Sequence, residues 1–389
     1  RTRFETLAGS AEFQRDQQSA EAIFELQKVL DMLEGLAAAA QPRSARVILE
    51  FESTFFDAFN QLCRRYTGRA ELVLLTLRIY TSLATALDFD LTSGDEMTRG
   101  FYRALWGYLE ILRDDSESLG LLGNDIMEAD ELYEGLRLAL DIIPILATYS
   151  SSSDMLQTNA HPATNGTSLI ADSVEDVILF AFITLAPKVT EACLRTPSIA
   201  YSFSAACADV TRVCAQRILQ LSAHGGHSGS ELLGNVASAL SKCCEADAID
   251  VAMNALTGIK ALATTSRRHL DGTTTPGTEA AGAPLRRLLF DVVRITLKMP
   301  LPTSLLDDYL LAIHALLLAL LQPALGGEEQ LRRSLAELCS RLSSGDGAQG
   351  HEAHQQQGGD VVEAVQTLFL AAQQHQPRVM VNGAEDGRS

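Results

Sequence analysis

The sequence has 389 residues, a formal net charge of −18, and 47% hydrophobic but only 6% aromatic residues. The acidic balance argues against nucleic-acid binding, which needs clustered Lys and Arg. Leu and Ala dominate the apolar content and no stretch alternates strictly between apolar and polar residues, so we expect helices and negligible sheet. The seven cysteines lie mostly in apolar helical patterns, which predicts core thiols in a reducing compartment.

The first part of the chain, residues 1–149, is predicted to form paired helices. Apolar residues recur at helical spacing, and Gly68 separates two of the periodic segments. The expected helices span 23–36, 45–65, 69–87, 94–112 and 125–148. A polar connection at 150–172, rich in Ser and containing Pro162, is expected to be a mobile loop.

The stretch 173–221 carries the clearest helix signals in the chain. Ser173 followed by Asp176 fits a capping box, and Thr196 with Pro197 fits a second helix start. The first helix is apolar on nearly all sides, with Phe182 in its middle, and the second has an apolar side that includes Ile199, Phe203 and Val210. Because neither helix could bury its apolar surface alone, each must lie between similar pairs, as in a helical solenoid.

The C-terminal part continues the pattern of helix pairs. Helices are expected over 229–243, 246–265, 284–299, 304–321, 328–343 and 359–374. Loops are expected at 267–283 and 344–358, and a disordered tail at 375–389. The intervals between pair starts resemble the HEAT unit of two antiparallel helices once inserted loops are allowed for. We therefore predict an all-α, HEAT/armadillo-like helical-repeat superhelix (an α-solenoid), with repeats over 1–149 and 173–374.

No catalytic, cofactor or metal site is predicted. The pairs His224/His227 and His351/His354 lack the HExxH spacing and a third ligand. We find no Gly-rich phosphate loop, nucleophile elbow or Ser/His/Asp arrangement. The apolar run 309–321 is shorter than the roughly 20 residues that a membrane span needs. These patterns favour a protein that is not an enzyme, has no cofactor and does not insert into membranes.

One charge feature stands out between residues 88 and 134. Thirteen acidic residues face three arginines there, so this segment carries ten of the net negative charges. Such runs are usually solvated faces, and that interpretation stays open. The competing hypothesis is a surface that attracts a basic protein. The candidate protein-binding residues flank the expected turn between two helices: Asp114, Asp115, Glu128, Asp130, Glu131 and Glu134.

Several of these segments resemble a known family. Three features are similar to the C-terminal part of exportin-4-like receptors: the acidic, apolar helix that starts at Ser173, a mid-helix Pro187, and the Thr196-Pro197-Ser198-Ile199 turn. These belong to the importin-β (karyopherin) family. The acidic helix over 128–143 matches the helix that precedes the same loop, and the resemblance covers most of 45–343.

The resemblance implies a function in nuclear transport. A receptor of this kind would carry protein cargo through nuclear pores together with Ran-GTP, would contact nuclear pore proteins, and would shuttle between nucleus and cytoplasm. The chain would then be the C-terminal part of a longer receptor. A HEAT-repeat scaffold unrelated to transport, such as an assembly platform, remains the alternative because fold alone does not determine function.

Overall fold

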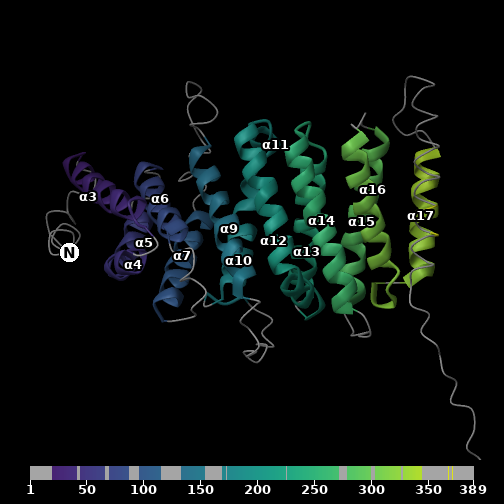
Figure 1. Ribbon diagram of the computed structural model, residues 1–389, viewed down its shortest axis with the longest axis horizontal. Coiled ribbons are helices and arrows are strands. Elements are labelled where there is room, and N and C mark those ends of the chain that lie inside the picture. The colour runs from purple at the N-terminus through teal and green to yellow at the C-terminus, as the bar shows by residue number, and fades with distance from the viewer. Residues whose placement is uncertain are drawn as a thin grey trace, which may run out of the picture.

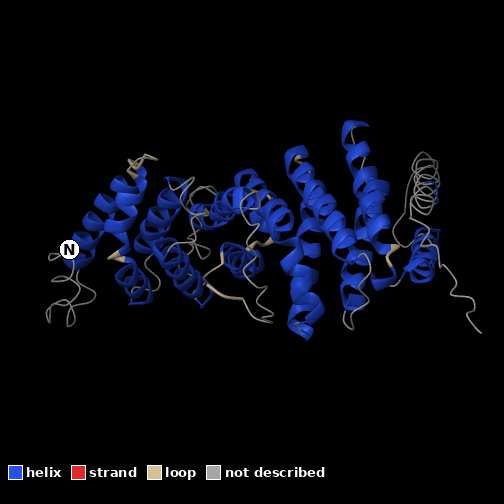
Figure 2. Cartoon of the chain, turned by 60° about the horizontal axis from the view of Figure 1, so that its bottom comes forward, coloured by secondary structure: helices blue, strands red, loops and turns tan. Residues whose placement is uncertain are grey.

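The computed structural model describes residues 20–41, 44–65, 70–86, 96–114, 133–153, 169–171, 173–224, 226–270, 278–298, 303–325 and 327–343, with residues 367 and 370. Within these ranges the regular secondary structure is helical throughout, and no strand is present (Figure 2). The expectation of a helical protein without sheet is confirmed for the described part of the chain.

The helices form two rows, and the chain passes back and forth between them. We name the rows after the first and the second helix of each helix pair. The second-helix row consists of α3 (Ala20–Ala38), α6 (Ala70–Ala86), α9 (Glu134–Ser153), α12 (Pro197–His224), α14 (Ile249–Leu270) and α16 (Thr303–Leu320). The first-helix row consists of α4 (Ala45–Ser53), α5 (Phe56–Arg65), α7 (Glu96–Asp114), α10 (Val174–Leu185), α13 (Gly226–Cys244), α15 (Thr278–Lys298) and α17 (Gly327–Ser343). Figure 1 shows the pairs following one another in chain order along the longest axis.

Successive helices pack on each other throughout the second-helix row, and several successive helices of the first-helix row do so too. In the second-helix row α3 packs on α6, α6 on α9, α9 on α12, α12 on α14 and α14 on α16. In the first-helix row α5 packs on α7, α7 on α10, and α13 on α15. The rows also pack on each other, as α12 does on α13. This stack of antiparallel pairs is the predicted all-α, HEAT/armadillo-like α-solenoid.

Polar side chains cross four junctions of the second-helix row. The partners of each bridge lie 44 to 56 residues apart in the sequence, close to one HEAT unit. The bridges are Gln27 to Glu71 at 3.4 Å, Arg78 to Glu134 at 2.6 Å, Asn254 to Ser204 at 3.1 Å and Lys260 to Asp308 at 2.8 Å. They add specific hydrogen bonds to an interface that is otherwise apolar.

Aromatic stacking joins the central layers of the solenoid. The Trp106 ring of α7 stacks on Phe180 of α10 with centroids 4.0 Å apart. On the same helix Phe182 is buried and stacks on Phe203 of α12, with centroids 6.4 Å apart and ring planes 6° from parallel. Because α10 presents Phe180 to α7 and Phe182 to α12, it must be apolar on opposite sides, as its sequence predicted.

The capping box predicted at the start of α10 does not form. Ser173 occupies the N-cap position in an extended conformation, but its side chain makes no capping hydrogen bond. The Asp176 carboxylate instead accepts the Ile170 N–H at 3.0 Å and pairs with Arg217 of α12, Nε to Oδ1, at 2.9 Å. This tertiary ion pair, buried between two helices, holds the carboxylate that the local motif would have used.

Other local predictions are refined by the structure. Pro187 does not lie in the middle of a helix: α10 ends at Leu185, and Pro187 belongs to the 3₁₀ turn η2 (Ala186–Lys188), before the short helix α11 (Glu191–Leu194). This agrees with the tendency of proline to end a helix. The second start signal is confirmed, since α12 begins at Pro197. The helix expected over 45–65 is divided by a turn at Thr54 and Phe55 into α4 and α5.

The predicted loops differ from the structure at their ends. Helix α9 continues to Ser153, into the connection expected at 150–172, most of which lies outside the described residues. Helix α14 reaches Leu270 and α15 begins at Thr278, so the segment 267–283 is helical at both ends. The predicted loop 344–358 and tail 375–389 lie outside the described residues, as does 359–374 apart from residues 367 and 370.

Candidate protein-binding surface

The structure places two of the six acidic residues that were predicted to bind a partner. Asp114 ends α7 and is exposed, with Arg113 Nε donating to its carboxylate at 3.0 Å. Glu134 begins α9 and accepts a hydrogen bond from the Arg78 guanidinium of α6 at 2.6 Å. Asp115, Glu128, Asp130 and Glu131 lie outside the described residues.

The described acids of the 88–134 segment do not form one open patch. Glu134 joins α6 to α9, and its place in the first turn also suits the positive end of the helix dipole. Glu96 lies within 3.4 Å of Arg99 and Glu110 within 3.8 Å of Arg64. Each of these acids therefore has an arginine beside it. The count of charges over 88–134 did not include the arginines that other helices bring to Glu110 and Glu134.

A groove with a volume of about 410 Å³ crosses three successive helices of the second-helix row. We call it the α9–α12–α14 groove. Its lining residues are Asp141 and Pro144 of α9, Tyr201, Ser202, Ala205, Ala208, Asp209 and Arg212 of α12, and Asn254 and Thr257 of α14. The groove thus spans three layers of the solenoid, which suits an extended ligand better than a compact one.

The sequence of α12 explains why a groove forms here. Tyr201, Ala205, Ala208 and Arg212 follow one another at spacings of three and four residues, so they share one helix face. The opposite face, with Phe203, is buried. Ala205 and Ala208 lie between the long side chains of Tyr201 and Arg212 on this face. Because alanine side chains are short, the surface forms a depression between the two long side chains. This stripe is the sequence signal for the groove, and it was not recognised.

The charges in the groove are paired, and its other side chains are polar, aromatic or small. Arg212 donates to Asp209 Oδ1 at 2.6 Å, and Asp141 lies 3.6 Å from Arg137 one turn earlier on α9. The Tyr201 side chain is 55% exposed. Tyrosines, amides and hydroxyls on a preformed surface suit protein recognition, since an aromatic ring supplies contact area and the small polar groups adapt their hydrogen bonds.

The buried titratable groups do not form a reactive centre. Burial raises the pKa of the Cys63 thiol to about 12 and holds the pKa of Cys207 and Cys214 well above the ordinary value. Such thiols are unreactive because the thiolate is the nucleophile. In the described ranges no three His, Cys, Asp or Glu side chains come together as a metal site would require, and no helix there is long and apolar enough to cross a membrane.

Glu52 is a buried carboxylate inside the N-terminal layers. It lies on α4, its side chain is inaccessible to solvent, and neither carboxylate oxygen has a hydrogen-bond partner. Burial raises the pKa of Glu52 to about 8, because the apolar surroundings disfavour the charged form. Because the charged form is disfavoured in the fold, Glu52 makes the stability of these layers depend on pH.

Comparisons with known proteins complete this description. No protein-family model matches the chain, and no curated protein matches it. Among solved structures, the chain is similar to one described as a "circular tandem repeat protein with novel repeat topology and enhanced subunit contact surfaces". The TM-score is 0.35 and the sequence identity is 12%, and the alignment covers 95% of this chain and 89% of that chain.

Proposed function

We propose that this chain is the protein-binding solenoid of an exportin-like nuclear transport receptor, which holds protein cargo together with Ran-GTP. Protein binding is supported by the α9–α12–α14 groove, with the exposed Tyr201 and the polar side chains of Asn254 and Thr257 across three layers. The transport role rests on the sequence resemblance of 128–143 and 173–203. A HEAT scaffold outside transport would bind proteins through the same groove without any dependence on Ran.

The groove favours an extended segment of a partner protein. Such a segment would stack an aromatic, aliphatic or cationic side chain on Tyr201 and form hydrogen bonds with Asn254 and Thr257. Since Asp209 and Arg212 already neutralise each other, long-range charge attraction contributes little here. Affinity then depends on contacts made after encounter, so changes should appear mainly in the dissociation rate.

The transport role is tested with Ran in its two nucleotide states. The purified chain is immobilised, and its binding to Ran loaded with a non-hydrolysable GTP analogue or with GDP is measured at physiological salt. A receptor should bind the GTP form more tightly, and Ran-GTP and cargo should raise each other's affinity by the same factor. Equal binding of both forms would remove the transport role and leave the scaffold interpretation.

The groove itself is tested by removing its exposed aromatic ring. Tyr201→Ala should weaken binding of any protein partner identified for the chain by about tenfold, through a faster dissociation rate. Phe24→Ala is the matched control because Phe24 on α3 is also 55% exposed but lies far from the groove in sequence and in the stack. If both substitutions have the same effect, or neither has any, the groove is not the binding surface.

A further inference from the structure

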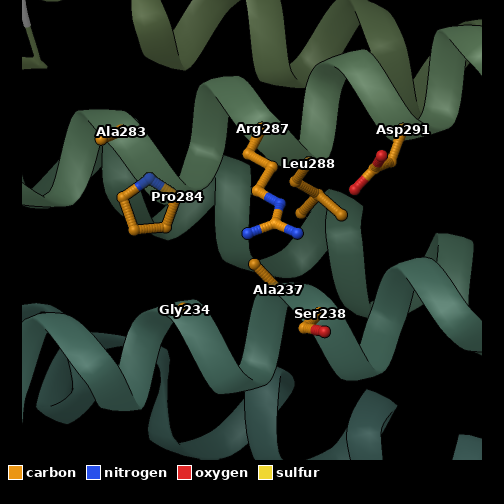
Figure 3. A pocket seen from close by; sticks show the side chains of 8 residues that line it. All are labelled: Gly234, Ala237, Ser238, Ala283, Pro284, Arg287, Leu288 and Asp291. Atoms are coloured by element: carbon orange, nitrogen blue, oxygen red, sulfur yellow. The ribbon is translucent and has the colours of Figure 1, made fainter.

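A second groove lies between α13 and α15, in the first-helix row. Its volume is about 270 Å³. We call it the α13–α15 groove. Its lining residues are Gly234, Ala237 and Ser238 of α13, and Ala283, Pro284, Arg287, Leu288 and Asp291 of α15 (Figure 3). The α13 side is formed by small residues, and a Cβ added at Gly234 would meet no atom within 4 Å. The small residues of α13 therefore leave the groove unfilled on that side.

Among the described residues that line this groove, Arg287 is the one cationic side chain. Figure 3 shows the Arg287 side chain extending from α15 toward α13, with its guanidinium over Ala237. Within the described part of the chain, no ion pair or hydrogen bond reaches Arg287, in contrast to Arg217, Arg294 and Arg332. The acid one turn later, Asp291, lies 3.3 Å from Arg294. Arg287 thus presents unneutralised positive charge on a chain whose net charge is −18.

We propose that the α13–α15 groove docks an acidic linear peptide, with an Asp or Glu carboxylate on Arg287 and a small apolar side chain beside it. An arginine fork matches a carboxylate in two parallel hydrogen bonds, and a charge-assisted bond of this kind is stronger than a neutral one. Pro284, Leu288 and Ala237 offer apolar contact on either side of the guanidinium. This surface is independent of the α9–α12–α14 groove and of any transport role.

The charges in the groove favour a carboxylate over a phosphate. A phosphate carries close to two negative charges at neutral pH and is usually held by several cationic groups. Here one guanidinium is present, and the Asp291 carboxylate lines the same groove. The peptide's own N–H groups or a Ser or Thr hydroxyl could donate to Asp291, which gives the peptide a direction along the groove.

The experiment begins with a phage library of random dodecapeptides panned against the whole chain and counter-panned against Arg287→Ala. The most enriched peptide is then synthesised with a fluorescein label, and its affinity is measured by fluorescence anisotropy. We expect enriched peptides to share an Asp or Glu next to Ala, Val or Ile. Arg287→Ala should weaken the labelled peptide by about tenfold or more, and Arg287→Lys should restore only part of the loss because an ammonium lacks the fork.

Two further variants separate the groove from general charge effects. Gly234→Leu should abolish binding by filling the groove, and its Cβ would meet no atom within 4 Å. Arg333→Ala removes an exposed arginine of α17, outside the groove, and should leave binding unchanged. Enrichment that survives both Arg287→Ala and Gly234→Leu would overturn the proposal. Tighter binding of a phosphoserine version than of the Glu peptide would overturn the assignment to a carboxylate.

Discussion

The contact between α12 and α14 depends on a glycine, and replacing it tests how closely the second-helix row packs. A Cβ at Gly258 of α14 would lie 2.7 Å from Thr211 Oγ1, 2.9 Å from Leu240 Cδ2 and 3.1 Å from the Ala208 Cα. The Leu240 methyl group can move by a rotamer change. Thr211 Oγ1 is held by hydrogen bonds to the Cys207 and Ala208 carbonyls, both at 2.9 Å, and the Cα can move only with α12.

The expected effect of Gly258→Ala is the balance of two terms. Alanine gains about 1 kcal/mol over glycine inside a helix. Overpacking of a close interface costs about 1–3 kcal/mol, and here it involves backbone, so the upper part of this range applies. We expect a net loss of about 1–2 kcal/mol. Gly234→Ala on α13 is the matched control, since its Cβ enters open space and the full propensity gain of about 1 kcal/mol should appear.

Hydrogen exchange measured by mass spectrometry reports this locally, which suits a repeat array that does not unfold as one unit. Gly258→Ala should speed amide exchange in peptides from α12 and α14 by about five- to thirtyfold, the factor that corresponds to 1–2 kcal/mol. Gly234→Ala should slow exchange in α13. If Gly258→Ala left exchange unchanged or slower, α12 and α14 would be further apart than the structure shows, and the argument would fail.

Three further substitutions test the core. Phe182→Ala should cost about 3–5 kcal/mol by leaving a cavity against Phe203, and exchange should rise mainly in the neighbouring layers; a uniform rise would contradict this. Arg217→Ala should cost about 3–5 kcal/mol because it leaves the buried Asp176 carboxylate without its partner, which urea unfolding measures. Burial raises the pKa of Glu52 in the folded chain to about 8, so the free energy of unfolding should fall as the pH rises from 4.5 through 8. Glu52→Gln cannot ionise, so its stability advantage over wild type should grow across this range. A difference that stays constant with pH would refute the burial argument.

The sequence predicted those parts of the fold that depend on neighbouring residues. Pro197 marks a helix start wherever it stands, because a proline at the first helical position loses no hydrogen bond. The apolar surroundings of Phe182 indicated burial on several sides, which only a stacked architecture supplies. Helix pairs and their order therefore followed from local patterns. Helix ends were less predictable, as at Leu270, where α14 continues past the expected stop.

What the sequence did not reveal depends on partners far apart in the chain. The Asp176 carboxylate meets Arg217, 41 residues later, and therefore does not complete the local capping box. Glu134 meets Arg78, 56 residues earlier, a pairing that the acidic run over 88–134 did not predict. The α9–α12–α14 groove is formed by side chains of three helices. Arg287 is available because no acidic side chain of a neighbouring helix pairs with it in the described part of the chain. The spacing of residues within one helix does not predict these contacts between helices.

The stacking of the two rows has a mechanical consequence. Contacts join successive layers, and α12, the longest of the described helices, also touches α15. We expect that a small sliding or tilting at each interface would leave the local cores intact, so that the displacements would add from layer to layer and change the distance between the ends. A peptide lying across α9, α12 and α14 would bridge two such interfaces at once. Occupying the groove would therefore stiffen the middle of the chain and change the distance between its ends.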